Sequence, residues 1–146
     1  MKKYIFLVYL FIIICYSFSY GQEKNVKIKV ESIRSTNGQL ILALFKTPEQ
    51  FEEEEPFRSI VLKKSSIKNG VLSVNVDLPV GQYGISLLDD ENKNKLMDYS
   101  FFGIPEEGFG FSNFVHTGFS KPDLKVFTIS IQNQKEQSIN FKIRYM

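Results

Sequence analysis

The sequence has very few of the residues on which many catalytic and structural sites depend. Its 146 residues include one cysteine, one histidine and no tryptophan. One cysteine cannot form an internal disulfide or a CxxC site, and one histidine cannot build a multi-histidine metal site. The lack of tryptophan argues against a sugar-stacking site. No phosphate-binding glycine loop, HExxH motif or serine or cysteine nucleophile motif is present. We therefore expect a protein that is not an enzyme.

The N-terminal segment has the organisation of a secretory signal peptide. Lys2 and Lys3 precede an almost unbroken apolar run over residues 4–15. This run is short for a bilayer span but suits the apolar core of a signal peptide. Small residues follow it, so we predict a signal peptide over residues 1–21 with cleavage after Gly21. Cleavage after Ser19 is the alternative.

Two other fates of this segment are disfavoured. Ile14 precedes Cys15 where a lipoprotein signal needs a small residue, so lipidation is not predicted. A retained membrane anchor is disfavoured because the apolar run is short and a cleavage site follows it. Of the 18 basic residues, Lys2 and Lys3 leave with the signal, and the remainder equals the 16 acidic residues. We expect an exported protein, either periplasmic or outside the cell as a secreted or cell-surface protein, with no membrane span after cleavage. A neutral chain gives no case for nucleic acid or an anionic membrane as partner.

The rest of the chain, residues 22–146, has the patterning of one β domain. Apolar residues alternate with polar ones over 26–30 and 71–78, whereas 39–45 is apolar on both faces and predicts a central strand. Asn69-Gly70 is a typical two-residue hairpin turn. Thr47-Pro48 predicts one short helical turn, followed by an acidic run over 52–55 interpreted as a solvated loop. The predicted strands are 26–30, 39–45, 60–62, 71–78, 83–88, 126–131 and 139–145.

This pattern predicts an all-β fold, an antiparallel Ig-like or prealbumin-like β-sandwich of about seven strands with one long ordered loop. Tyr83 follows a Pro/Gly corner at the start of a strand. A tyrosine there resembles the tyrosine corner of Ig-type sandwiches, where the hydroxyl bonds back to nearby backbone. The loop over 89–123 is the anomaly, because connections beyond roughly 12–15 residues in a compact domain are usually functional or disordered. Its many aromatic residues favour order.

Three motifs lie in order along this part of the chain. They are LPVGQY over 78–83, DDENKNKLMD over 89–98 and GIPEEGFGFSN over 103–113. Together they resemble the DUF2141 family, small exported bacterial proteins of unknown function. The resemblance covers most of residues 22–146 and implies an exported β domain without an established activity. Asp89 stands where many members have histidine, and Lys95 stands where many have glycine.

The second motif has the spacing of a calcium-binding loop. Side-chain oxygens recur at positions 1, 3, 5 and 9, with a backbone carbonyl at position 7. These positions are Asp90, Asn92, Asn94 and Asp98, with Leu96 supplying the carbonyl. Glycine at position 6 and glutamate at position 12 are replaced by Lys95 and Phe101, so the site would be weak or would take Glu106 or Glu107 as a ligand. The alternative is a tight turn in which Asp and Asn side chains bond their own backbone.

Aromatic residues crowd the same segment. Exposed, they would form a binding surface for an envelope protein or a small ligand. The alternative, favoured by the length of the loop, is that it folds back over the sandwich and buries its own phenylalanines. The candidate surface consists of Phe101, Phe102, Phe109, Phe111 and Phe114, with Phe119 nearby.

Three functions follow from these features. The first is a non-enzymatic binding or structural module of the cell envelope that uses the 89–123 loop. The second is a domain whose loop is stabilised by calcium, the one cofactor that the sequence suggests. The third and weakest is a hydrolase acting through Asp90, Glu106 and His116, which no nucleophile motif supports. His116 is more simply a surface or loop-packing residue.

Overall fold

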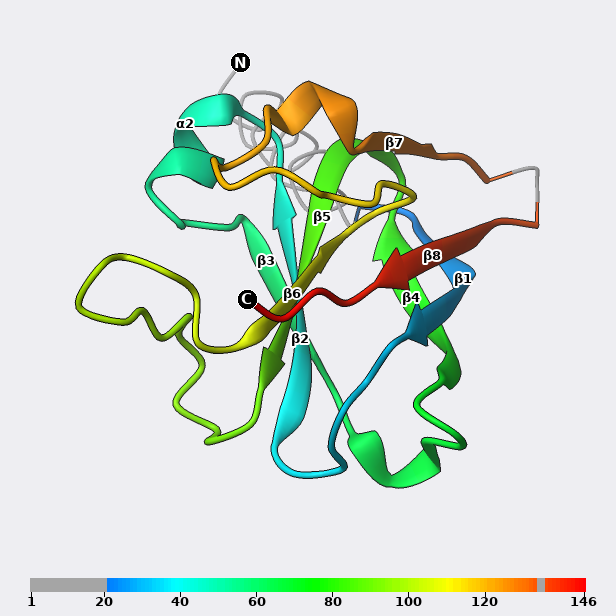
Figure 1. The fold of residues 1–146 in the computed structure, drawn as a ribbon. Coiled ribbons are helices and arrows are strands. Elements are labelled where there is room, and N and C mark those ends of the chain that lie inside the picture. The colour runs from blue at the N-terminus through cyan, green and yellow to red at the C-terminus, as the bar shows by residue number, and fades with distance from the viewer. Residues whose placement is uncertain (1–20, 134–135) are drawn as a thin grey trace, which may run out of the picture.

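A computed structural model describes residues 21–133 and 136–146, and its strands form two packed sheets (Figure 1). The predicted signal peptide covers residues 1–21. Residues 1–20 lie outside the described residues, so only Gly21 of this segment is described. Among the helices of the described ranges, none has the length and apolar character that crossing a membrane requires.

The smaller sheet has three strands in the order β4-β1-β8. Strand β1 pairs antiparallel with β4 and parallel with β8. The parallel pair departs from the antiparallel pattern that we expected of neighbouring strands. It arises because β8, at the end of the chain, lies beside β1, at its beginning, rather than beside the strand that precedes it. The bounds are β1 Glu23–Glu31, β4 Leu72–Pro79 and β8 Ser138–Lys142.

The larger sheet has five strands and centres on β5. Strands β3, β2, β5 and β6 lie in this order, and β7 pairs with the first part of β5. All its pairings are antiparallel. The bounds are β2 Gln39–Phe45, β3 Arg58–Leu62, β5 Gly81–Asp90, β6 Gly108–Phe111 and β7 Thr128–Ile131, with helix α2 at Pro48–Glu52 and 3₁₀ turns η1 at Lys64–Ser66 and η2 at Leu124–Val126.

The main core lies between the two sheets. Alternate residues of β1 and β4, in the smaller sheet, face alternate residues of β2 and β5, in the larger sheet, because successive strand side chains point to opposite faces. Val26, Ile28 and Val30 are fully buried against this interior. Strand β2 is central and apolar on both faces, as predicted, and its second face carries Phe45 into another cluster.

That second cluster lies on the outer face of the larger sheet, away from the main core. Helix α2 covers it, and Thr47 caps the helix by accepting a hydrogen bond from the Gln50 amide, at 3.3 Å. Edge-to-face and tilted aromatic contacts join its rings. Its buried members are Phe45, Phe51, Phe111, Leu124 and Phe127.

The β-sandwich prediction is confirmed, and two local predictions hold with it. The hydroxyl of Tyr83 donates to the Pro79 carbonyl at 2.5 Å, so the tyrosine corner is present. Asn69 and Gly70 both have positive φ, and Lys68 and Val71 exchange two backbone hydrogen bonds across them, as in a type I′ turn. The turn lies between β3 of the larger sheet and β4 of the smaller sheet, so it does not connect two paired strands as a hairpin turn would.

The strand count and the long loop differ from expectation. The described residues form eight strands rather than about seven, because β6 lies inside the predicted 89–123 loop. Strand β5 also continues to Asp90, so the loop begins two residues later than predicted. Alternating glycines conceal β6 in the sequence. They are required by close packing: a Cβ on Gly108 would lie 2.3 Å from the Tyr145 ring, and one on Gly110 would lie 3.1 Å from the Lys142 carbonyl oxygen. β6 therefore divides the predicted loop into two, residues 91–107 and 112–123.

Candidate functional site

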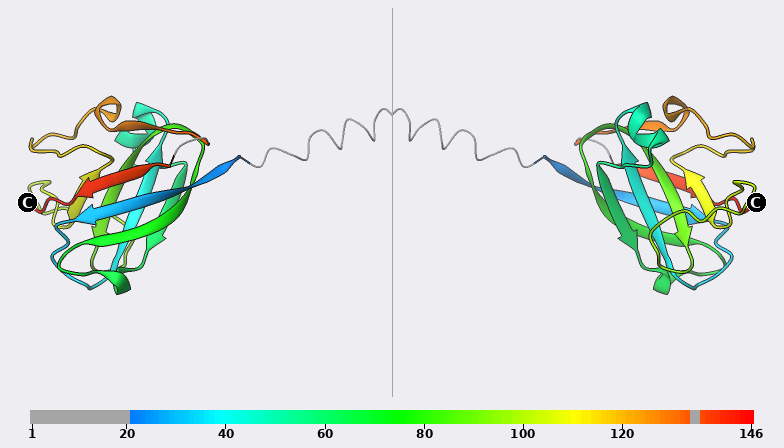
Figure 2. Two further views of the ribbon diagram at one scale, coloured as in Figure 1. Left: turned by 90° about the vertical axis from the view of Figure 1, so that its right-hand side faces the viewer. Right: turned by 90° about the vertical axis from the view of Figure 1, so that its left-hand side faces the viewer.

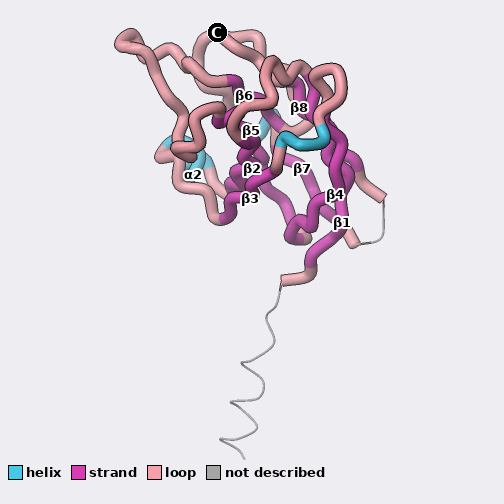
Figure 3. The backbone as a smooth tube through the Cα atoms, turned by 90° about the horizontal axis from the view of Figure 1, so that it is seen from below, coloured by secondary structure: helices cyan, strands magenta, loops and turns pink. Residues whose placement is uncertain are grey.

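The two loops project from the same side of the sandwich, the side where the C-terminus lies (Figure 2). Seen from below, they gather beside the larger sheet, with α2 at their edge (Figure 3). Between them lies a cavity of about 480 Å³ on the outer face of that sheet. Small-molecule sites have volumes of roughly 300–1,000 Å³, so its size suits a small ligand.

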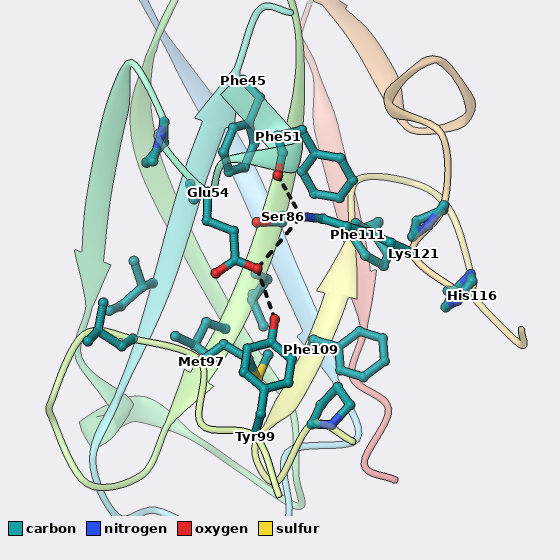
Figure 4. Close-up of a pocket in the computed structure, with 18 of the residues that line it drawn as sticks. Phe45, Phe51, Glu54, Ser86, Met97, Tyr99, Phe109, Phe111, His116 and Lys121 are labelled. Carbon is teal, nitrogen blue, oxygen red and sulfur yellow. Dashed lines mark hydrogen bonds and ion pairs between the residues drawn. The ribbon is translucent and has the colours of Figure 1, made fainter. Parts of the chain in front are cut away.

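The floor of the cavity comes from the central strands. Ala43 of β2 and Ser86 of β5 are paired neighbours in the sheet, and both line the cavity. Their small side chains leave open space where larger residues on the same faces would fill it. Phe51, Phe109 and Phe111 form apolar walls around this floor (Figure 4).

One carboxylate joins the two loops across the cavity. Tyr99, from the 91–107 loop, donates its hydroxyl to Glu54 Oε1 at 2.9 Å. Lys121, from the 112–123 loop, places its ammonium 3.6 Å from the same oxygen and donates to the Phe51 carbonyl at 2.6 Å (Figure 4). Burial and the neighbouring Glu54 raise the pKa of Tyr99 to about 12, so it stays a neutral donor.

The predicted aromatic surface is divided by the fold. Phe111 is buried, and Phe109 and Phe114 pack partly against the second cluster, as the fold-back interpretation expected. Phe101 and Phe102 are 98% and 84% exposed at the tip of the 91–107 loop, where their rings form an edge-to-face pair. Phe119, 91% exposed, lines the cavity from the other loop.

The predicted calcium loop brings its residues together. Asp90 is fully buried and accepts hydrogen bonds from the amides of Asn94 and Lys95, both at 3.1 Å. Asn92 and Asn94 each accept a backbone amide two residues on and donate their side-chain amides to Asp98. Lys95 has φ +67, the conformation that glycine would adopt with less strain. These bonds are those of the self-bonded turn that was the alternative to calcium.

Glu107 lies beside this loop, and part of its carboxylate has no partner. Its Oε1 accepts a hydrogen bond from the Glu91 amide at 3.0 Å. Its Oε2 is buried without a hydrogen-bond partner among the described residues. Burial, followed by the charges of Asp98 and Asp90, raises the pKa of Glu107.

Replacing Glu107 by glutamine should stabilise the domain above the raised pKa of the glutamate. A carboxyl group with a raised native pKa favours folding while it is protonated, and that contribution is lost as pH rises through the native value. We expect Glu107→Gln to match the wild type at pH 4 and to be more stable at pH 8 by about 1–3 kcal/mol, because above the raised pKa the wild type buries a charged oxygen without a hydrogen-bond partner, whereas glutamine stays neutral. Urea denaturation at the two pH values measures this. A difference in unfolding free energy that is the same at both pH values would contradict this prediction. The control is Glu106→Gln, at the exposed neighbouring position, which should not show this pH-dependent gain.

The hydrolase residues are not assembled into one site. The His116 ring packs near Phe109, Phe111 and Phe114, with centroid separations of 5.9–6.3 Å. No hydrogen bond joins its imidazole to Asp90 or Glu106 in residues 21–133 and 136–146. His116 also lines the cavity.

The sequence did not indicate the polar residues of the cavity. Glu54 belongs to the acidic run interpreted as solvated, and its partners Tyr99 and Lys121 are 45 and 67 positions away. The one local signal is a non-glycine residue in the left-handed region, since Glu54 has φ +57, and this becomes visible only in the structure.

The fold and the cavity define a two-sheet β-sandwich with an open apolar site on its larger sheet. The chain belongs to the DUF2141 family, described as uncharacterized proteins conserved in bacteria, whose model matches residues 28–140. No curated protein and no solved structure matched the chain.

Proposed function

We propose that this protein is an exported, non-enzymatic module of the cell envelope that binds a small apolar ligand in the cavity between its two loops. Export is supported by the basic start and the apolar run at residues 4–15. Binding is supported above all by the cavity itself. It is lined by aromatic side chains and floored by two small residues, Ala43 and Ser86.

The ligand that fits is chiefly apolar and uncharged. Two charged side chains of the cavity, Glu54 and Lys121, already satisfy one another, because Glu54 binds Tyr99 and Lys121, and Lys121 also binds two backbone carbonyls. Lys95 also lines the cavity and is exposed. A charged ligand that took Glu54 or Lys121 as its partner would have to break these contacts. Ser86 lies on the floor and can offer a hydroxyl to a single polar atom of the ligand (Figure 4).

Binding of the neutral dye N-phenyl-1-naphthylamine tests this function. The chain has no tryptophan, so indole fluorescence does not interfere. We expect a blue-shifted dye emission that saturates at one dye per chain. Ser86→Phe should fill the floor of the cavity and weaken binding at least about tenfold, a loss of roughly 1.4 kcal/mol.

The matched control is Ser73→Phe, which adds the same side chain at an exposed position of β4 in the other sheet. It should bind the dye as the wild type does. Circular dichroism melts establish that both variants are folded. The proposal would be abandoned if the wild type gave no saturable signal, or if the two variants bound the dye equally.

We propose as a second function that calcium stabilises the 90–98 loop. The supporting observation is Glu107, whose buried and unpartnered oxygen belongs to a carboxylate flanked by Asp90 and Asp98. A hard cation would offset this concentration of negative charge. In the described ranges no three His, Cys, Asp or Glu side chains are placed to hold a metal ion. Asn92 and Asn94 would therefore have to turn their amide oxygens from backbone amides toward the ion.

A thermal melt in millimolar calcium, compared with chelator, tests the second function. We expect a higher midpoint with calcium, since a ligand that binds only the folded state stabilises it. At a concentration of about ten times Kd the gain is roughly 1.4 kcal/mol. Asp98→Asn should abolish the shift, whereas Asp77→Asn, on the surface of β4, should not. Equal midpoints with calcium and with chelator would exclude the site.

A further inference from the structure

A lysine and an aspartate lie buried together at the end of the larger sheet that is remote from α2. Lys64, in the η1 turn after β3, and Asp89, near the end of β5, have side chains that are 2% and 0% exposed. The Lys64 ammonium contacts Asp89 Oδ1, yet this oxygen has no hydrogen-bond partner among the described residues. The ammonium donates instead to the Ser35 carbonyl at 3.1 Å.

This arrangement is a poor environment for a full ion pair. Lysine is almost never fully buried, and removing both charges from water costs several kcal/mol for each ion in real proteins. A buried pair repays that cost only when its geometry is good and its remaining donors and acceptors are satisfied. Here the oxygen beside the nitrogen lacks a proper hydrogen bond. Transfer of one proton from nitrogen to oxygen gives a neutral amine and a neutral carboxylic acid, which a dry interior tolerates better.

A third residue holds the other oxygen of the aspartate. Tyr145 donates its hydroxyl to Asp89 Oδ2 at 2.5 Å. The hydroxyl oxygen in turn accepts a hydrogen bond from the Arg34 backbone amide at 3.1 Å, and the Arg34 guanidinium lies 4.2 Å from the centre of the tyrosine ring. Burial, followed by the hydrogen bond to Asp89, raises the pKa of Tyr145, so its proton stays on the hydroxyl. Asp89 Oδ2 is therefore held by a neutral donor.

We propose that Lys64 and Asp89 form an intramolecular isopeptide bond. After one proton has moved from Nζ to Oδ1, the lone pair of Nζ attacks Cγ of Asp89 and the carbonyl electron pair moves to Oδ2. Tyr145 donates its hydrogen bond to the negative charge that develops there, in the manner of an oxyanion hole. The Cγ–Oδ1 bond then breaks, a second proton passes from nitrogen to the departing oxygen, and one water leaves. The product is a neutral secondary amide, and no oxidant or other reactant is needed.

The fold supplies the conditions for this condensation. It holds the amine against the carboxyl group, which replaces an encounter between separate molecules by a step within one molecule. Burial excludes the water that would favour the ionic reactants. The bond would close the chain between residues 64 and 89 into a ring, in a sequence whose single cysteine allows no internal disulfide. Tyr145 is a catalytic residue in this scheme, because it contacts the reacting carboxyl group.

The mass of the denatured full chain, as recovered after expression, tests the bond directly. We expect the wild type to be one water lighter than the sum of its residues, and Lys64→Arg to show no such loss. N-terminal processing affects both proteins alike, so the difference between them is independent of it. Asp89→Asn forms the same product by losing ammonia, and should have the same mass as the wild type. A wild type with the full mass, after denaturation, would overturn the proposal.

The role of Tyr145 has its own test. Tyr145→Phe keeps the ring and removes the hydroxyl, so we expect a mixture in which the unlinked form persists and converts slowly. Tyr99→Phe removes a hydroxyl in the cavity, away from the reacting groups, and should be fully linked. Linkage of Tyr145→Phe as fast as that of the wild type would overturn the catalytic role of Tyr145. Fragmentation of the linked peptides places the bond at Lys64 and Asp89 or excludes those residues.

Discussion

Phe127→Ala should destabilise the domain by about 3–5 kcal/mol, the range found when a large aromatic residue is removed from a core. Phe127 is almost completely buried, and its ring centre lies 4.7 Å from that of Phe111 and 5.1 Å from that of Phe51. The substitution leaves a void at the junction of α2, β6 and the η2 turn. Because Phe51 and Phe111 are also walls of the cavity, dye binding should weaken together with stability.

Urea denaturation of Phe127→Ala and of Val126→Ala distinguishes the loss of ring packing in the aromatic cluster from the effect of any truncation in the η2 turn. Val126 is the neighbouring residue and is half exposed, so its truncation should cost less than about 1 kcal/mol. The two variants change adjacent positions of the same segment and differ in burial. Equal losses would mean that the aromatic cluster on the outer face of the sheet contributes little to folding.

Gly38→Ala should lower the free energy of unfolding by about 3 kcal/mol or more. Most of this loss should come from a clash of the added Cβ with the backbone of another strand, and the rest from the unfavourable φ. Gly38 has φ +75, and a Cβ there would lie 2.0 Å from the Asp90 carbonyl oxygen and 2.5 Å from the Glu91 Cα. The end of β5 would have to move away from β2. We expect the hydrogen bond from Gln39 Nε2 to Asp90 Oδ2, at 2.7 Å, to be lost with this movement.

Gly103→Ala is the control for this effect. Gly103 has φ +73, nearly the same as Gly38, but a Cβ there would meet nothing within 4 Å. Its replacement should cost about 1–2 kcal/mol at most, the penalty for a side chain in the left-handed region. The difference between the two melting midpoints isolates the clash with β5. Similar midpoints would contradict the close approach of these two backbones.

Local patterns predicted most of the strands and turns. Period-two alternation located β1 and β4, and the two-sided apolar run located β2 to the residue. These predictions succeed because strand geometry places neighbouring side chains on opposite faces, whatever the rest of the chain does. The Tyr83 corner and the Asn69-Gly70 turn were predictable for the same reason, since their bonds join residues close in sequence.

β6 and the parallel partner of β1 were not predictable in this way. In β6, glycines occupy the alternate positions that face Tyr145 and Lys142, and the need for them arises from contacts with the far end of the chain. The pairing of β1 with β8 joins the beginning of the described chain to its end. No short-range pattern can specify which of several similar strands will be the neighbour.

The sequence by itself determined that this chain forms a β-sandwich, that its unusual segment lies after Leu88, and that the segment contains a polar turn at 90–98 and a cluster of phenylalanines. Only the tertiary structure decided which residues of these parts lie together. It divided the phenylalanines between a core and a surface, joined Tyr99 and Lys121 through Glu54, and buried Lys64 against Asp89. The physical reason is that patterns of two to four residues specify local geometry, whereas a site is made by side chains that meet only when distant strands and loops pack together.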